Sequence, residues 1–126
     1  MKLLSASILA AVLLAGCGSM SPAPDTPTRT SEGVLIGPTG MTLYTFDRDA
    51  AGSGKSACNG PCATNWPPLS VADDAKAMGA YTIIVRDDGK KQWTYKGWPL
   101  YYWSKDMKAG DKTGDGFGNA WKVARP

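Results

Sequence analysis

Apolar and polar positions alternate in short runs along most of the chain, and Gly, Pro and Asp separate the runs, which predicts strands rather than helices. Residues 34–36 and 41–46 flank a Gly-Pro-Thr-Gly turn and predict a first hairpin. Residues 81–86 and 91–96 flank Asp-Asp-Gly-Lys and predict a second hairpin, because Asp and Gly tolerate the positive φ of tight turns. A final strand is expected over residues 121–124.

Helical patterns are few and weak. Residues 63–66 predict one helical turn, which Pro67 and Pro68 end. Residues 70–78 are the one longer candidate, and two Asp residues weaken it. About six strands and little helix predict an all-β, mainly antiparallel fold, for which a small sandwich and a partly closed barrel both remain open.

One ten-residue pattern occurs twice. Residues 40–49 read GMTLYTFDRD and residues 97–106 read GWPLYYWSKD, so that Gly, Leu, Tyr, an aromatic residue and Asp recur in register. A Gly-rich segment and then a Trp follow each copy. We therefore predict an internal duplication with a pseudo-twofold axis, in which repeat 1 covers about residues 33–69 and repeat 2 about residues 81–126.

The first residues have the form of an export signal. Lys2 supplies a positive charge, and residues 3–15 form an apolar run that is too short for a permanent membrane span. We interpret residues 1–16 as a signal peptide. Residues 14–17 read Leu-Ala-Gly-Cys and match a bacterial lipobox, so we expect the mature protein to begin at a lipidated Cys17. The alternative is an ordinary secretory signal with a chance Cys.

The segment from residue 17 to residue 31 is rich in Ser, Pro and Thr and has no apolar periodicity, which predicts a disordered tether before a folded domain at 32–126. Acyl chains contribute about 0.8 kcal/mol per buried methylene, so a lipidated Cys17 would hold the protein on the membrane. Gly and Ser at positions 18 and 19 lack the Asp of an inner-membrane retention signal. In a Gram-negative host we expect the outer membrane, on its periplasmic or surface face.

Composition narrows the function classes. Five Trp and five Tyr supply apolar area for one small core, and there is no His. The net charge is +3, and removal of Lys2 with the signal peptide leaves 13 basic against 11 acidic residues, a net charge of +2 with the signs interspersed. This pattern offers no electrostatic footprint for nucleic acid. Motifs for nucleophilic catalysis or nucleotide binding are not found either, and no cofactor is expected.

A family resemblance rests on residues from both repeats. It comprises Arg86-x-x-Gly89, Gln92-Trp93, the Cys pair discussed below, and two copies of a Tyr-x-aromatic-x-x-Asp motif with the Trp that follows each, namely Tyr44, Phe46, Asp49, Trp66, Tyr101, Trp103, Asp106 and Trp121. This pattern resembles a family of predicted bacterial lipoproteins named for that motif, the secreted repeat of unknown function. The resemblance implies a secreted or lipid-anchored repeat domain, and it brings no established reaction.

Cys58 and Cys62 are the two thiols that remain when Cys17 carries lipid. In an oxidising compartment they predict a disulfide that stabilises the fold by about 2 kcal/mol. The alternative is a redox-active pair that serves extracytoplasmic electron transfer. Against it, the spacing is one residue longer than Cys-x-x-Cys, and neither a clear helix start nor a His is present to lower the pKa of a thiol.

Two pairs of carboxylates are candidates for chemistry. Asp111 and Asp115 lie in a Gly-rich loop that faintly resembles a calcium loop, although Lys112 interrupts it and the favoured alternative is hydrogen bonding to local backbone N–H groups. Asp49 and Asp106 stand at equivalent positions of the two repeats. A shared role in capping the following loop explains both, whereas a catalytic pair would require them to converge across the pseudo-twofold axis.

Aromatic residues exceed what a core of this size needs. Adjacent Tyr101, Tyr102 and Trp103 must point to opposite faces of a strand. Trp98 and Tyr102 are candidates for an exposed binding surface, because flat apolar rings with a polar rim suit sugars and partner proteins. Packing in the core is the alternative for each.

These observations favour a non-enzymatic, lipid-anchored envelope protein that acts as an interaction or structural module. Its expected partners are the membrane, through the lipid, and an envelope protein or glycan. An accessory of extracytoplasmic redox machinery is the alternative, and an enzyme that uses Asp49 and Asp106 on cell-wall material is a weaker third hypothesis.

Overall fold

The computed structural model describes residues 26–126, so the predicted signal peptide and Cys17 lie outside the described residues. The elements are β1 (Arg29–Ser31), β2 (Val34–Ile36), β3 (Tyr44–Phe46), α1 (Pro61–Asn65), β4 (Tyr81–Val85), β5 (Lys91–Tyr95), β6 (Trp98–Pro99), the 3-10 turn η1 (Phe117–Asn119) and β7 (Trp121–Val123). Within residues 26–126 no helix is long and apolar enough to cross a membrane.

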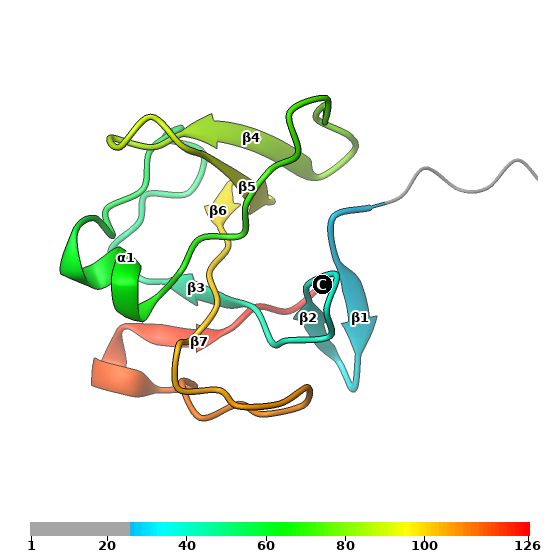
Figure 1. Ribbon diagram of the computed structural model, residues 1–126, viewed down its shortest axis with the longest axis vertical. Coiled ribbons are helices and arrows are strands. Elements are labelled where there is room, and N and C mark those ends of the chain that lie inside the picture. The colour runs from blue at the N-terminus through cyan, green and yellow to red at the C-terminus, as the bar shows by residue number, and fades with distance from the viewer. Residues whose placement is uncertain (1–25) are drawn as a thin grey trace, which may run out of the picture.

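The strands form three small antiparallel sheets, β1–β2, β3–β7 and β4–β5–β6 (Figure 1). The β3–β7 pair crosses the middle of the domain, and β4 and β5 lie at one end of it. The prediction of a mainly antiparallel all-β fold is confirmed. The described strands do not close into a barrel.

The predicted second hairpin is confirmed as β4 and β5. Its last register pair is Val85 with Lys91, and the turn is closed by hydrogen bonds from Arg86 N to Lys90 O (2.8 Å) and from Gly89 N to Arg86 O (2.9 Å). Gly89 has φ 81°, the left-handed conformation that ends a three-residue hairpin loop. The Asp-Gly pair therefore sets the register of this sheet.

The fold begins earlier than the sequence predicts. Residues 29–31, which we assigned to the tether, form β1 and pair with β2 through a two-residue turn at Glu32 and Gly33, both with positive φ. Thr28 is already buried. All three side chains of β1 are exposed, so the strand has no apolar face that a sequence pattern can reveal.

Two other local predictions need correction. The first hairpin forms from Ile36 to Leu43, with an isolated bridge between Ile36 and Thr42, but beyond it β3 pairs with β7 instead of β2. Residues 70–78 are not helical; they follow an irregular path with two isolated bridges, between Ser70 and Gln92 and between Met78 and Tyr81. The predicted helical turn does occur, as part of α1.

The two repeats are related by matching backbone hydrogen bonds. At the centre, Tyr44 N donates to Tyr101 O (2.8 Å) and Tyr101 N donates to Tyr44 O (3.0 Å). Farther out, Leu69 N donates to Leu100 O (2.9 Å), as Ala124 N does to Leu43 O (2.8 Å). This reciprocity is the pseudo-twofold relation that the duplicated motif predicts.

Each repeat places its tryptophan segment beside the motif strand of the other. β7 of repeat 2 pairs with β3 of repeat 1, and Pro68 of repeat 1 forms a bridge with Tyr101 of repeat 2. The repeats are thus interleaved, and they do not lie side by side as two independent units.

Four aromatic rings form a continuous stack across the junction. Phe46 stacks on Trp121 with ring centroids 4.2 Å apart, Trp121 on Trp66 at 3.8 Å, and Trp66 on Trp103 at 4.0 Å. A second apolar cluster, on the opposite face of the motif strands, contains Leu35, Leu43, Leu69, Trp93, Leu100 and Ala124. Alternation along each strand supplies both clusters at once.

Candidate functional site

The motif tyrosines and aspartates bond across the two repeats. Tyr44 Oη donates to Asp106 Oδ2 (2.6 Å), and Tyr101 Oη donates to Asp49 Oδ2 (2.7 Å). Each tyrosine therefore comes from one copy of the motif and its carboxylate from the other. Both tyrosines are fully buried, and both aspartates are more than nine-tenths buried.

The second oxygen of each carboxylate holds the loop that follows its own motif. Asp49 Oδ1 accepts a hydrogen bond from Ala57 N (2.6 Å). Asp106 Oδ1 accepts hydrogen bonds from Thr113 N (3.0 Å) and Thr113 Oγ1 (2.6 Å). Each aspartate thus fastens a loop to the opposite repeat, the shared capping role that the equivalent positions suggested.

Burial shifts the titration of these groups. Burial raises the pKa of Tyr44 far above its usual value, and the hydrogen bond to Asp106 adds to the effect. Burial likewise raises the pKa of Tyr101, to which the charge of Asp49 contributes. The pKa of Asp49 is also raised by burial, although bonds from Ala57 and Tyr101 oppose this. Both tyrosines therefore remain neutral hydrogen-bond donors at physiological pH.

A buried polar cluster extends from the bond between Tyr101 and Asp49. The Arg86 side chain has no exposed area, and its guanidinium donates to Ser56 Oγ (2.9 Å), Gln92 Oε1 (2.7 Å) and Cys58 O (2.6 Å). Ser56 Oγ in turn bonds Tyr101 Oη (2.7 Å). This Arg86 cluster ties the first loop, in repeat 1, to the β4–β5 hairpin of repeat 2.

Sequence reasoning missed the role of Arg86, Gln92 and Ser56. The first two belong to the family pattern, but the sequence analysis assigned them no role, and they lie next to a turn and on a strand. What a sequence pattern cannot show is that Gln92 lies under the strand at Leu100, to whose carbonyl Gln92 Nε2 donates (2.8 Å). The paired strands bury the Arg86 side chain beside its three neutral acceptors, with the carboxylate oxygen Asp88 Oδ2 3.6 Å from Nε.

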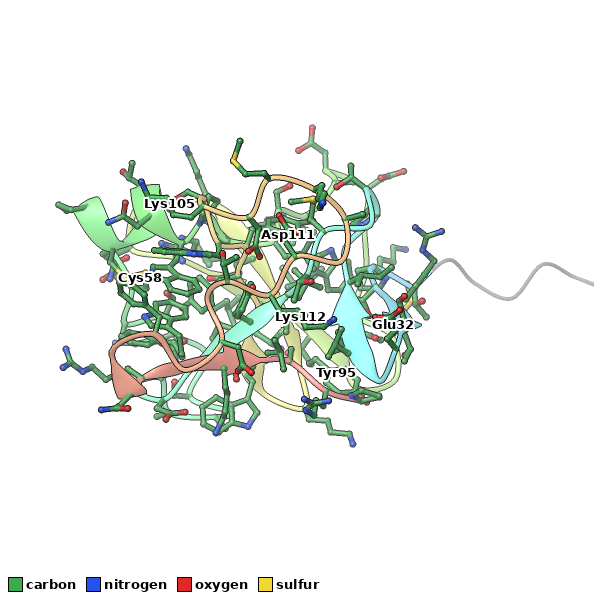
Figure 2. The ribbon with its side chains drawn as sticks, turned by 90° about the horizontal axis from the view of Figure 1, so that it is seen from below. Glu32, Cys58, Tyr95, Lys105, Asp111 and Lys112 are labelled. Atoms are coloured by element: carbon green, nitrogen blue, oxygen red, sulfur yellow. A yellow bond between two sulfur atoms is a disulfide. The ribbon has the colours of Figure 1, made fainter. Side chains whose placement is uncertain are left out.

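The predicted disulfide between Cys58 and Cys62 is confirmed. Cys58 is fully buried in the cluster that contains the stacked tryptophans, while Cys62 is partly buried in α1. The bridge therefore closes the end of the first loop against the core. Figure 2 shows Cys58 on the side of the domain away from Tyr95.

The candidate calcium loop uses its carboxylates on local backbone. Asp111 Oδ2 accepts hydrogen bonds from Met107 N (2.9 Å) and Lys108 N (3.1 Å), and Asp115 Oδ1 accepts one from Val123 N (3.1 Å). Over residues 26–126, no three His, Cys, Asp or Glu side chains lie together in a way that could hold a metal ion.

The two candidate surface aromatics do not share a site. Tyr102 lines a cavity of about 270 Å³ with Met41, Thr42 and Trp103, and its hydroxyl packs against Gly37, where an added Cβ would lie 2.1 Å from the oxygen. Trp98 lines a separate groove of about 390 Å³. The residues of this Trp98 groove are Thr45, Tyr95, Lys96, Trp98, Asp115, Lys122, Val123, Ala124 and Arg125.

Cations gather beside the rings of the Trp98 groove. Lys96 Nζ lies 5.2 Å from the centroid of the Tyr95 ring, and Lys122 Nζ lies 5.9 Å from that of Trp98. Both distances fall within the range of a cation–π interaction. Lys122 also forms an exposed ion pair with Asp47 at 3.1 Å.

Fold and site together define a duplicated antiparallel β domain. Each repeat places its tryptophan segment beside the motif strand of the other repeat, and the tyrosine of each motif donates a hydrogen bond to the aspartate of the other. Residues 26–70 and 82–125 each match the family described as the secreted repeat of unknown function. The chain belongs to this family, and the resemblance drawn from the motif is confirmed. Its members are secreted, which places the domain outside the cytoplasm. No curated protein and no solved structure matches the chain.

Double-mutant cycles will test the crossed bonds. We expect Tyr44→Phe with Asp106→Ala, and Tyr101→Phe with Asp49→Ala, to show coupling energies of about 1.5–3 kcal/mol, because each pair loses one buried hydrogen bond to a charged group. Tyr44→Phe with Asp49→Ala, a pair within one motif, should be additive to within about 0.5 kcal/mol. Urea unfolding gives the free energies, and equal coupling within and across motifs would contradict the arrangement.

The disulfide should act as a structural link. The Cys58→Ala, Cys62→Ala double variant is expected to lose about 2 kcal/mol of unfolding free energy, since its loop is short. Dithiothreitol should lower the stability of the wild type by a similar amount and leave the variant unchanged. Rapid exchange with glutathione, together with a reduction potential above about −200 mV, would instead support the redox hypothesis.

Proposed function

We propose that this protein is a lipid-anchored binding module of the bacterial envelope. Lipidated Cys17 holds it on the membrane, which is the outer membrane in a Gram-negative host, and the Trp98 groove receives its partner. The observation that carries the proposal is the exposure of one tryptophan: Trp66, Trp93, Trp103 and Trp121 are buried, whereas Trp98 is partly exposed and belongs to neither core cluster.

The placement of Trp98 supports a role in binding. It lies in β6, a strand of two residues that follows a tight turn at Lys96 and Gly97, both with positive φ. The turn is braced, because Gly97 O accepts a hydrogen bond from Gly52 N (3.0 Å). An added Cβ at Gly97 would lie 2.6 Å from that nitrogen. Because this support is rigid, the partly exposed indole of Trp98 loses little conformational entropy when a ligand binds.

The motif carboxylates favour structure over catalysis. Both oxygens of Asp49 and of Asp106 accept hydrogen bonds within the fold, one from a tyrosine of the opposite repeat and the other from a loop. A general acid or base needs an oxygen that reaches the substrate. The carboxylates whose equivalent positions raised the hypothesis of a catalytic pair are thus already engaged in hydrogen bonds within the fold.

The anchor limits where the module works. Eight residues lie between Cys17 and Thr26, the first described residue, and a fully extended chain spans about 3.3–3.6 Å per residue. Thr26, where the described fold begins, therefore stays within about 30 Å of the lipidated residue. A partner of the Trp98 groove must be reachable near the membrane, as envelope proteins and glycans are.

Metabolic labelling will test the anchor. Cells that receive an alkyne fatty acid should incorporate label into the wild-type protein and into the Cys58→Ala, Cys62→Ala control, and not into Cys17→Ser. Lipid on Cys17 is the reason for this difference. An unlabelled wild-type protein in the soluble fraction would mean that residues 1–16 are part of an ordinary secretory signal.

A crosslinking pull-down from the native envelope will test the groove. We expect Trp98→Ala to lose the captured partner with little change in melting temperature, because Trp98 is outside the core clusters. Phe117→Ala removes another exposed aromatic side chain, 51% accessible, and should keep the partner. A large loss of stability in Trp98→Ala would show that Trp98 has a structural role in packing and would contradict the proposal.

A further inference from the structure

We infer that the Trp98 groove binds an acidic saccharide, a chain of sugar rings that carries carboxylate groups. This inference rests on the proposed function, since it names the ligand class of the same groove. Three features carry it: the balance of charge, the position of the cations relative to the rings, and the small number of free backbone groups at the strand edges beside the groove.

The groove has an excess of positive charge. Lys96, Lys122 and Arg125 line it, against one carboxylate, Asp115. One oxygen of Asp115 already accepts a hydrogen bond from Val123 N. The ion pair of Lys122 with Asp47 is exposed on both sides and is worth little in water, so a ligand carboxylate can replace it. An anionic ligand is therefore complementary to this groove.

The rings place apolar surface next to that charge. Tyr95 and Trp98 each have a lysine ammonium within 6 Å of the ring centroid. A sugar presents a face of C–H groups, which suits an aromatic ring, and a carboxylated sugar carries its charge on the edge of the same ring. A volume of about 390 Å³ lies within the range of small-ligand sites, about 300–1,000 Å³.

Within residues 26–126, a peptide strand finds little free backbone beside the groove. The outer edge of β7 is occupied, because Gly116 N donates to Trp121 O (2.7 Å) and Val123 N donates to Asp115 Oδ1 (3.1 Å). β5 lies between β4 and β6 and is paired on both sides. β6 is an edge strand, but Gly97 O before it already accepts a hydrogen bond from Gly52 N (3.0 Å), and Pro99 has no N–H to donate. Added strands depend on main-chain hydrogen bonds for affinity. Recognition in the Trp98 groove must come from side chains, which favours a saccharide over an extended acidic peptide.

Calorimetry with the full-length processed protein in detergent will test the inference. The probes are trigalacturonic acid, which carries three carboxylates, and neutral maltotriose. We expect the acidic trisaccharide to bind at least tenfold more tightly than the neutral one, and more weakly at 500 mM than at 50 mM salt because salt screens exposed charges. Trp98→Ala and Lys122→Gln should each weaken binding tenfold or more.

The matched control is Lys105→Gln. Lys105 is also exposed, and Figure 2 shows it on the opposite side of the domain from Tyr95, so its removal should leave binding unchanged. If Trp98→Ala fails to fold, the binding of trigalacturonic acid to the surface variant Lys122→Gln tests the inference instead.

Three results would overturn the inference: no binding of trigalacturonic acid, equal binding of maltotriose, or tighter binding of a glutamate-rich peptide. The pull-down keeps the two proposals apart. If Trp98→Ala loses the envelope partner while trigalacturonic acid does not bind, the groove remains a binding site and the ligand class is wrong. If trigalacturonic acid does not bind and Trp98→Ala still captures the envelope partner, the binding-module proposal also fails.

Discussion

Two aspartates are buried in this small domain, and each needs donors to offset the loss of hydration. The donor on one side is a tyrosine from the other repeat, with O–O distances of 2.6 and 2.7 Å. Removing either tyrosine would leave a buried carboxylate short of a partner, at a cost well above that of an ordinary hydrogen bond. The interleaving of the repeats follows, because Tyr44 and Tyr101 can reach across only while their backbones are paired with each other.

The two halves satisfy this shared requirement differently. In repeat 1 the loop after the motif is fastened by a disulfide and by the Arg86 cluster. In repeat 2 the corresponding loop is held by Thr113 and by the close fit of Gly114, where a Cβ would lie 2.7 Å from the Trp66 ring. The unmatched Cys pair is therefore part of a loop attachment that repeat 2 achieves by packing, and its asymmetry does not require a separate chemistry.

The sequence supports prediction of the features that depend on local chemistry. The Asp-Gly turn identified the β4–β5 hairpin, and the duplicated motif identified the pseudo-twofold relation. Pairing between distant strands was not predictable, because alternation says which face of a strand is buried and not which strand covers it. The same limit explains why the sequence did not show that Trp98 and Tyr102 lie in separate sites. The two side chains would share a face only if the strand continued straight from residue 98 to residue 102. The backbone instead changes partner, from β5 at Pro99 to β3 at Tyr101.

The Trp98 groove and the core lie on opposite faces of β7. Along β7, Trp121 and Val123 point inward and Lys122 points outward. The stack of Trp121 on Phe46 thus fixes the register that brings Lys122 opposite Thr45 and beside Trp98. Thr45 belongs to repeat 1, while Trp98 and Lys122 belong to repeat 2, so the groove exists only where the repeats are interleaved. A ligand held there binds the native arrangement alone and, by linkage, stabilises the contact between the repeats in proportion to RT ln(1 + [L]/Kd).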